Sequence, residues 1–221
     1  MAGAIWPRHN RAMPDPLALQ TLCGQLDRGE IHRGEFLDRF TREVALDIGC
    51  SRAAVRLLVN TESGAVLRCI AIFDAGREAM AQASDLPAGA ADAYFDALLN
   101  DGCVVASDAR SHPATSMLGP SYLEPQDVHS LLDVSFSVNG VLYGTFSCEQ
   151  TGTAAAWTPH QLKRLREIGS RASLTLMHAI TSEIDTAPGA LWQSSTPNRL
   201  MTMPMPLDAD AVVYRVSPER S

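Results

Sequence analysis

The stretch Leu131–Glu149, LLDVSFSVNGVLYGTFSCE, decides the fold. Two strand-like runs meet at Asn139-Gly140, and both residues tolerate the positive φ that a two-residue type I′ turn requires. Residues alternate between two faces along both arms. One face carries Leu132, Val134, Phe136, Val138, Phe146 and Cys148, and the other carries Asp133, Ser135, Ser137, Thr145, Ser147 and Glu149. The stretch therefore predicts a β-hairpin with one apolar and one polar face.

The polar face of this hairpin is the point on which function depends. Such a face either meets water or forms the floor of a ligand cavity that loops and short helices cover. A long segment, residues 75–125, precedes the hairpin and carries two short apolar runs. Cover from this segment favours the cavity floor.

Composition places the chain among single soluble globular domains. Its 221 residues are 46% hydrophobic and 19% charged. The net charge of -7 and the pI near 5.3 argue against general affinity for nucleic acid or anionic membranes. The 5 cysteines form no CxxC pair, so they predict neither a disulfide framework nor a zinc site. No apolar run approaches the roughly 20 residues that a membrane helix needs. We expect a cytoplasmic protein.

The flanking patterns predict an α+β domain. Helices are expected over 15–28, 34–48, 91–99 and from the capping box at Thr158 to about 184. Further strands are expected over 53–60, 66–74 and 103–107, with a loop over 75–89 and a structured loop or short helix over 108–125. This order predicts an antiparallel sheet of five or six strands, with terminal helices on the apolar face and short helices and loops over the polar face. We expect residues 1–33 to be a leader with a short helix, 34–182 the domain and 183–221 a flexible tail.

Several runs together resemble the GAF domain. They are CSRAAVRLLVNTESGAVLRCIAIFD, YFDAL, VVASDARSHPATSM, SYLEPQDVHSLLDVSFSVNGVLYGTFSCEQTG and WTPHQLKRLREIGSRASLTL. The variety found in bacterial sensor histidine kinases and diguanylate cyclases is the most similar. The resemblance covers roughly residues 34 to 182. It implies a PAS-like fold, a small-molecule pocket between the polar sheet face and the short middle helices, and terminal helices that pair in dimers.

The chain departs from several functional subgroups of that family. The signature of cyclic-nucleotide binders, the GVCG segment of free methionine sulfoxide reductases and the bilin-attachment context of phytochromes are not recognisable. Where close relatives have Cys-His-Glu-His, this chain has Ser147-Cys148-Glu149-Gln150. No haem or metal ligand is expected there, and no cofactor can be named.

The implied pocket gives a set of candidate ligand-binding residues. They are Phe73, Asp74, Ala91, Tyr94, Phe95, Asp108, Met117, Tyr122, Ser135, Thr145, Ser147 and Glu149. A structural role competes at most of these positions. Phe73 also fits the core, Asp108 also fits a turn cap, and the aromatic and Met residues also fit plain packing. The four residues from the hairpin are either solvated or the floor of the pocket.

These features predict a non-catalytic sensory or regulatory domain that binds a small molecule or a protein partner. The apolar stripe on the helix from Thr158 is wider than one sheet contact needs, which predicts a homodimer through the terminal helices. No kinase, cyclase or DNA-binding output signature occurs, so either a separate signalling protein carries the output, or the chain is a fragment or a degenerate member. Two alternatives stay open. One is a redox enzyme of the methionine sulfoxide reductase type that uses Cys103 or Cys148, and the other is a ligand-free interaction module.

Overall fold

An antiparallel sheet forms the centre of the computed structural model, which describes residues 17–61, 64–82, 84–87 and 92–186. Its strand order is β3-β2-β1-β7-β6-β5, and β4 also pairs with β2. The strands are β1 (Arg52–Thr61), β2 (Gly64–Asp74), β3 (Ala79–Met80), β4 (Leu86–Pro87), β5 (Cys103–Ala106), β6 (Val128–Val138) and β7 (Val141–Thr151). The expected α+β architecture is confirmed.

The central hairpin forms as its sequence predicts. Val138 pairs with Val141 across a two-residue turn, where φ is 52° at Asn139 and 75° at Gly140. Both values lie in the left-handed region of a type I′ turn. The second hairpin joins β1 to β2, and β1 then pairs with β7, far along the chain.

The contact between β1 and β7 depends on a glycine. A Cβ atom built on Gly144 would lie 1.9 Å from the carbonyl oxygen of Arg56 on β1. No side chain fits at that distance, so the close approach of the two backbones requires glycine.

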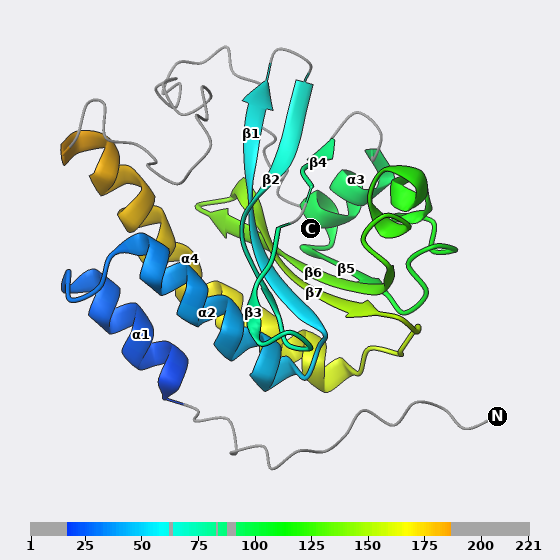
Figure 1. Ribbon diagram of the computed structural model, residues 1–221. Helices are drawn as coiled ribbons and strands as arrows, with labels where there is room; N and C mark the ends of the chain where they lie inside the picture. Colours follow the sequence, from blue (N-terminus) through cyan, green and yellow to red (C-terminus); the bar gives the residue numbers. More distant parts are fainter. Residues whose placement is uncertain (1–16, 62–63, 83, 88–91, 187–221) are drawn as a thin grey trace.

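Two helices, α2 (Arg33–Ile48) and α4 (Pro159–Thr186), cover the apolar face of the sheet, and α1 (Ala18–Asp27) packs against both of them (Figure 1). Their termini follow the expected chemistry. Gly49 ends α2 with φ 75°, and Thr158 Oγ1 accepts from the N–H of Gln161 at 3.2 Å at the start of α4. Leu22 of α1 is buried in the same core as Phe40 of α2 and Leu165 of α4. The helix within the expected leader is thus part of the fold, and α4 continues past residue 182.

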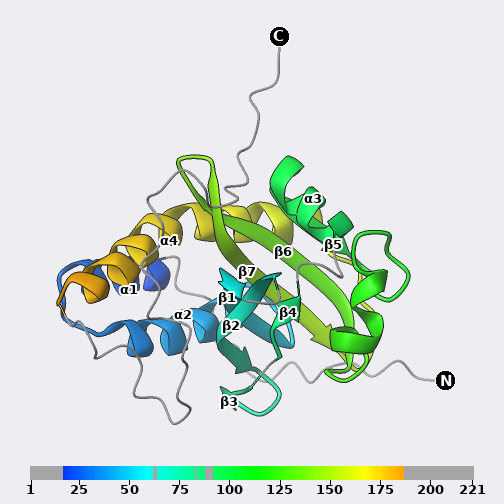
Figure 2. The ribbon, with the colours of Figure 1, turned by 90° about the horizontal axis from the view of Figure 1, so that it is seen from above.

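A roof of short helices covers the opposite face: α3 (Asp92–Asn100), η2 (Ser116–Leu118) and η3 (Gly119–Leu123). Figure 2 shows the sheet between this roof and the terminal helices. The roof has its own apolar cluster, which includes Leu98, Leu118 and Leu131. Two cores therefore lie on the two faces of one sheet.

Two features differ from expectation. The segment 75–89, expected as a loop, contains β3 and β4, and two-residue strands leave no alternation that a pattern can reveal. The helix expected to begin at Asp15 starts at Ala18, and Asp15 lies outside the described residues. In the part of the chain that the structure describes, no helix is long and apolar enough to cross a bilayer.

Candidate functional site

The polar face of the hairpin is closed over. The side chains of Asp133, Thr145, Ser147 and Glu149 are all buried at 0% exposure beneath the roof. Ser135 is half-buried, and Ser137, nearer the turn, is exposed. Of the two interpretations left open for this face, the solvated one is therefore wrong for Thr145, Ser147 and Glu149.

Arg56 lies at the centre of the covered face. Its neighbours Val55 and Leu57 belong to the helix-side core, so strand alternation directs Arg56 to the roof side. The Nη2 atom of Arg56 donates to Glu149 Oε1 at 2.9 Å, and both side chains of this ion pair are 0% exposed. A buried pair of this kind is costly to form, and removing one partner is strongly destabilising.

Two tyrosines connect the roof to the charged residues of the sheet. Tyr122 of η3 donates its hydroxyl proton to Glu149 Oε1 at 2.5 Å, and its hydroxyl oxygen accepts from Arg56 Nη2. The guanidinium carbon of Arg56 also lies 5.1 Å from the centre of the Tyr122 ring. Tyr94 of α3 donates to Asp133 Oδ2. Of the roof elements, α3 and η3 are thus each fixed to the sheet by one tyrosine hydroxyl.

Burial sets the protonation of this network, which we call the covered network: Arg56, Tyr94, Tyr122, Asp133 and Glu149. Burial raises the pKa of both tyrosines well above its usual value, so both remain O–H donors. Burial also raises the pKa of Asp133 to about 6, although Arg56 and the bond from Tyr94 oppose that rise. For Arg56, burial opposes the charge, but Tyr122 and Glu149 keep its pKa well above the usual value.

Several polar atoms of the covered network have no hydrogen-bond partner among the described residues. These buried atoms are Arg56 Nε and Nη1, Asp133 Oδ1 and Glu149 Oε2. Glu149 Oε2 has an ion-pair contact of 4.0 Å with Arg52 Nη1 at the edge of the network. An unsatisfied buried polar atom costs about 1 to 3 kcal/mol. The network can therefore supply both N–H donors and carboxylate acceptors to a bound molecule.

Several expected pocket residues lie elsewhere. Phe73 packs in the helix-side core with the Arg42 guanidinium 5.4 Å from its ring centre. Asp74 caps the turn after β2, accepting from the N–H groups of Gly76 at 2.9 Å and Arg77 at 3.1 Å. Phe73 therefore lies on the other face of the sheet, whereas Asp74 also pairs with Arg52 at 3.0 Å, and Arg52 in turn contacts Glu149 at the edge of the covered face.

Other expected pocket residues belong to the roof or its loop. Phe95 is buried in the roof cluster, but Met117 is 68% exposed because η2 turns Leu118 inward in its place. The placement of Met117 as a roof-lining residue is therefore wrong. Asp108 is at the surface and accepts from the N–H of Arg110 at 3.2 Å, as a turn cap does. Ala91 lies outside the described residues.

Arg56 and Asp133 are the network residues that the sequence prediction missed. A signal for Arg56 was present in the sequence, since it is the one charged residue in the apolar run 53–59. Strand alternation also places it on the face opposite to Val55 and Leu57. Two carboxylates on the polar face of the hairpin also require a buried cation. Pairing of β1 with β7, which brings these residues together, was not visible in the sequence.

The two thiols of the redox alternative lie away from the covered network. Cys148 is fully buried on the helix side of the sheet, where burial raises its pKa well above the usual value. Cys103 packs at the edge of that same core, and its sulfur accepts from Arg166 Nη2 at 2.9 Å. Neither thiol shares a face with the polar residues of the hairpin. The described residues contain no group of three or more His, Cys, Asp or Glu that could hold a metal.

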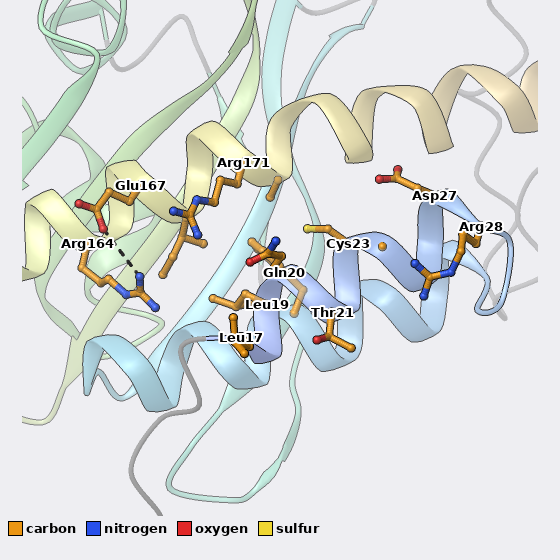
Figure 3. Close-up of a pocket in the computed structure, with 14 residues that line it drawn as sticks. Leu17, Leu19, Gln20, Thr21, Cys23, Asp27, Arg28, Arg164, Glu167 and Arg171 are labelled. Carbon is orange, nitrogen blue, oxygen red and sulfur yellow. Dashed lines mark ion pairs between the residues drawn. The ribbon is translucent and has the colours of Figure 1, made fainter.

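A groove lies on the helix side of the molecule. Its volume is about 860 Å³, and it lies between α1 and α4, as Figure 3 shows. Apolar residues such as Leu19 and Ile168 line it together with Arg28, Arg164 and Arg171. The sheet separates it from the covered network, so the groove is an outer surface of the helix layer.

Comparison with solved structures supports the fold. The GAF domain of Thermosynechococcus elongatus PixJ in its blue-light absorbing form matches with a TM-score of 0.56 and 17% identity, over 73% of this chain and 94% of that one. The GAF domain of an Acinetobacter phosphoenolpyruvate-protein phosphotransferase matches with a TM-score of 0.56 and 14% identity, over 74% and 93%. The free methionine-R-sulfoxide reductase of Neisseria meningitidis, in complex with its substrate, matches with a TM-score of 0.56 and 15% identity, over 75% and 89%.

Sequence comparison gives the family. No curated protein matches the chain. The family model described as GAF domain matches residues 32–176, which is well over half of the chain. That span contains the sheet, the roof and the covered network. The chain therefore belongs to the GAF domain family.

Proposed function

We propose that this GAF domain is a non-catalytic sensory or regulatory module that binds a small molecule at the covered network. The observation that supports the proposal is the set of buried atoms on Arg56, Asp133 and Glu149 that have no hydrogen-bond partner among the described residues. Purely structural polar clusters are usually fully hydrogen-bonded, and an incompletely satisfied cluster is typical of a site that another molecule completes.

The signal would pass through the sheet to the terminal helices. Glu149 and Arg56 lie on β7 and β1, and Cys148 and Val55, next to them in the chain, pack into the helix-side core. A shift of these strands on ligand binding therefore changes the surface on which α2 and α4 rest. These two helices are coupled, because Arg164 Nη2 lies 2.7 Å from Asp47 Oδ2. We propose that a separate signalling protein reads their arrangement.

The test is native mass spectrometry of the protein purified from its own host. A retained mass that disappears on denaturation would support the proposal and would identify the ligand. A protein without bound mass, combined with no thermal shift across a metabolite library, would refute it. That second result would favour the ligand-free interaction module, which the close packing of Tyr94 and Tyr122 over the sheet also fits.

The same proposal includes a homodimer through the helix layer. Leu174 on the outer side of α4 is 54% exposed, and the groove between α1 and α4 lies on the same layer. Light scattering at micromolar concentration is expected to give twice the monomer mass, and Leu174→Asp is expected to give the monomer. Met117→Asp is the matched control, since Met117 is 68% exposed on the roof. A monomeric wild type, or dissociation by both variants, would exclude this dimer.

A further inference from the structure

The covered network contains more carboxyl groups than cations. Asp133 and Glu149 lie beside one guanidinium group, that of Arg56, and all three side chains are 0% exposed. At the edge of the network, Arg52 lies 4.0 Å from Glu149 Oε2, but it also pairs with Asp74 at 3.0 Å. This outer pair brings one more charge of each sign, so it leaves the excess of one carboxyl group unchanged. If both buried carboxyl groups were ionised, the network would carry a negative charge without a counter-charge, which is costly away from water.

The hydrogen bonds indicate which carboxyl group keeps a proton. Glu149 Oε1 accepts from Arg56 Nη2 at 2.9 Å and from the Tyr122 hydroxyl at 2.5 Å, so the guanidinium charge is held against this carboxylate. Asp133 Oδ2 accepts from the Tyr94 hydroxyl, a neutral donor, and Asp133 Oδ1 has no hydrogen-bond partner among the described residues. A neutral O–H group without a partner costs less than a charge without one. One proton on Asp133 therefore removes the excess charge and leaves the ion pair of Glu149 with Arg56 in place.

The groups that face Asp133 come from four elements. They are one cation, one carboxylate, two hydroxyl groups and one apolar side chain: Arg56 of β1, Glu149 and Ser147 of β7, Tyr94 of α3 and Val104 of β5. Burial is the largest influence on the pKa of Asp133 and raises it, whereas the cation and the two hydroxyl groups lower it and the carboxylate raises it further. The result is a pKa of about 6, which agrees with the count of charges.

Tyr94 connects this carboxyl group to the roof. It lies on α3, is 0% exposed and donates its hydroxyl proton to Asp133 Oδ2. Leu98, one turn further along the same helix, is buried in the roof cluster, and α3 packs on β5 and on β6, the strand that carries Asp133. A negative charge on Asp133 therefore gains water when α3 moves away from the sheet.

We propose that Asp133 is a proton-binding site that controls the roof: α3 stays on the sheet while the proton is bound and moves off it when the proton is released to water. Acid therefore favours the closed roof, because the closed form holds the proton over a range of pH in which a solvated carboxyl group has lost it. The site needs no small molecule, so it goes beyond the proposed function and can fail separately from it.

The size of the effect follows from the protonation of the two forms. With α3 open, Asp133 is in water and has its ordinary pKa of 3.8, and with α3 closed its pKa is about 6. Between these two values the equilibrium constant for opening of α3 rises about 10-fold for each pH unit, which gives about 100-fold in all. Outside this window the constant is level, because both forms then have the same protonation.

Hydrogen–deuterium exchange of the full chain, read by mass spectrometry, tests the inference between pH 4 and pH 7.5. After correction for the intrinsic pH dependence of amide exchange, opening of α3 is expected to rise about 100-fold across this range in wild type. On the other face, α2 is the internal reference and is expected to stay more protected than α3 at every pH, because the helix-side core remains closed when α3 opens. The rise is expected to be absent in Asp133→Asn, whose side chain has the same shape and no charge. Asp96→Asn is the matched control and is expected to behave as wild type, because Asp96 is an exposed carboxylate on the same helix.

Three results would overturn the inference: an opening of α3 in wild type that does not change with pH, the same rise in Asp133→Asn, or equal protection of α2 and α3 at every pH. If circular dichroism shows that Asp133→Asn does not fold, the wild type decides through NMR of isotope-labelled aspartate. One carboxyl carbon is then expected to titrate near pH 6, and its absence would overturn the proton site.

The proposed function is distinguished by its own test. If opening of α3 depends on pH but native mass spectrometry finds no retained molecule and no metabolite shifts Tm, the proton site stands and ligand binding is wrong. If a molecule is retained while opening of α3 does not depend on pH, the sensory site stands and the proton site is wrong.

Discussion

Replacement of Asp133 by Asn is expected to change how the stability of the protein depends on pH. Burial raises the pKa of Asp133 from 3.8 to about 6 in the folded chain. Between pH 4 and 6 the folded protein therefore keeps a proton that the unfolded chain has released. Stability then falls as pH rises through this window, because the native state binds more protons than the unfolded state does.

The magnitude follows from the shift. One pKa unit corresponds to about 1.4 kcal/mol, so a shift of roughly two units gives about 3 kcal/mol. Wild type is expected to lose about 3 kcal/mol relative to Asp133→Asn between pH 4 and pH 7.5. For a domain of this size that is roughly 6 to 12 °C in Tm. Arg56, Tyr94, Ser147 and Glu149 face the carboxyl group, and their effects on its pKa are already included in this shift.

The assay is equilibrium urea unfolding of both proteins at several pH values. Subtracting one unfolding free energy from the other at each pH cancels the pH-dependent contributions of groups that titrate alike in both proteins. This subtraction requires that both proteins unfold in two states. Tyr94→Phe is expected to enlarge the effect, because it removes a hydrogen bond that lowers the pKa of Asp133. A free-energy difference that stays constant from pH 4 to pH 7.5 would refute the reasoning.

Three further changes test the fold. Gly144→Ala is expected to abolish folding, at a cost of more than about 4 kcal/mol, because the added Cβ would collide with the backbone of β1. Gly34→Ala is the control and should stay folded, because the atom nearest to its added Cβ is 3.4 Å away. Soluble yield and circular dichroism report the result, and a folded Gly144→Ala would contradict the close approach. Thr158→Ala is expected to cost about 1 kcal/mol in thermal unfolding through loss of the cap on α4, and an unchanged Tm would contradict the capping box. Arg56→Met is expected to lower the unfolding free energy in urea by about 3 to 5 kcal/mol, since it leaves the buried Glu149 without its cation. A decrease below about 1 kcal/mol would show that the ion pair is not isolated from water.

The sequence determined the local structure of this protein. Asn139-Gly140 fixed the register of the hairpin, and residue alternation on its two arms separated an apolar from a polar face. Gly49 and Thr158 fixed the ends of the long helices. These features depend on residues close together in the chain, so elementary backbone and capping rules predict them.

Only the tertiary structure decided what the polar face does. Arg56 meets Glu149 because β1 pairs with β7, about ninety residues later in the chain, and both meet Tyr122 because η3 folds back over the sheet. Met117 and Leu118 are adjacent and both apolar, yet the direction of one short helical turn exposes the first and buries the second. Alternation assigns a side chain to a face, but the burial that raises the pKa of Asp133 depends on the elements packed above that face.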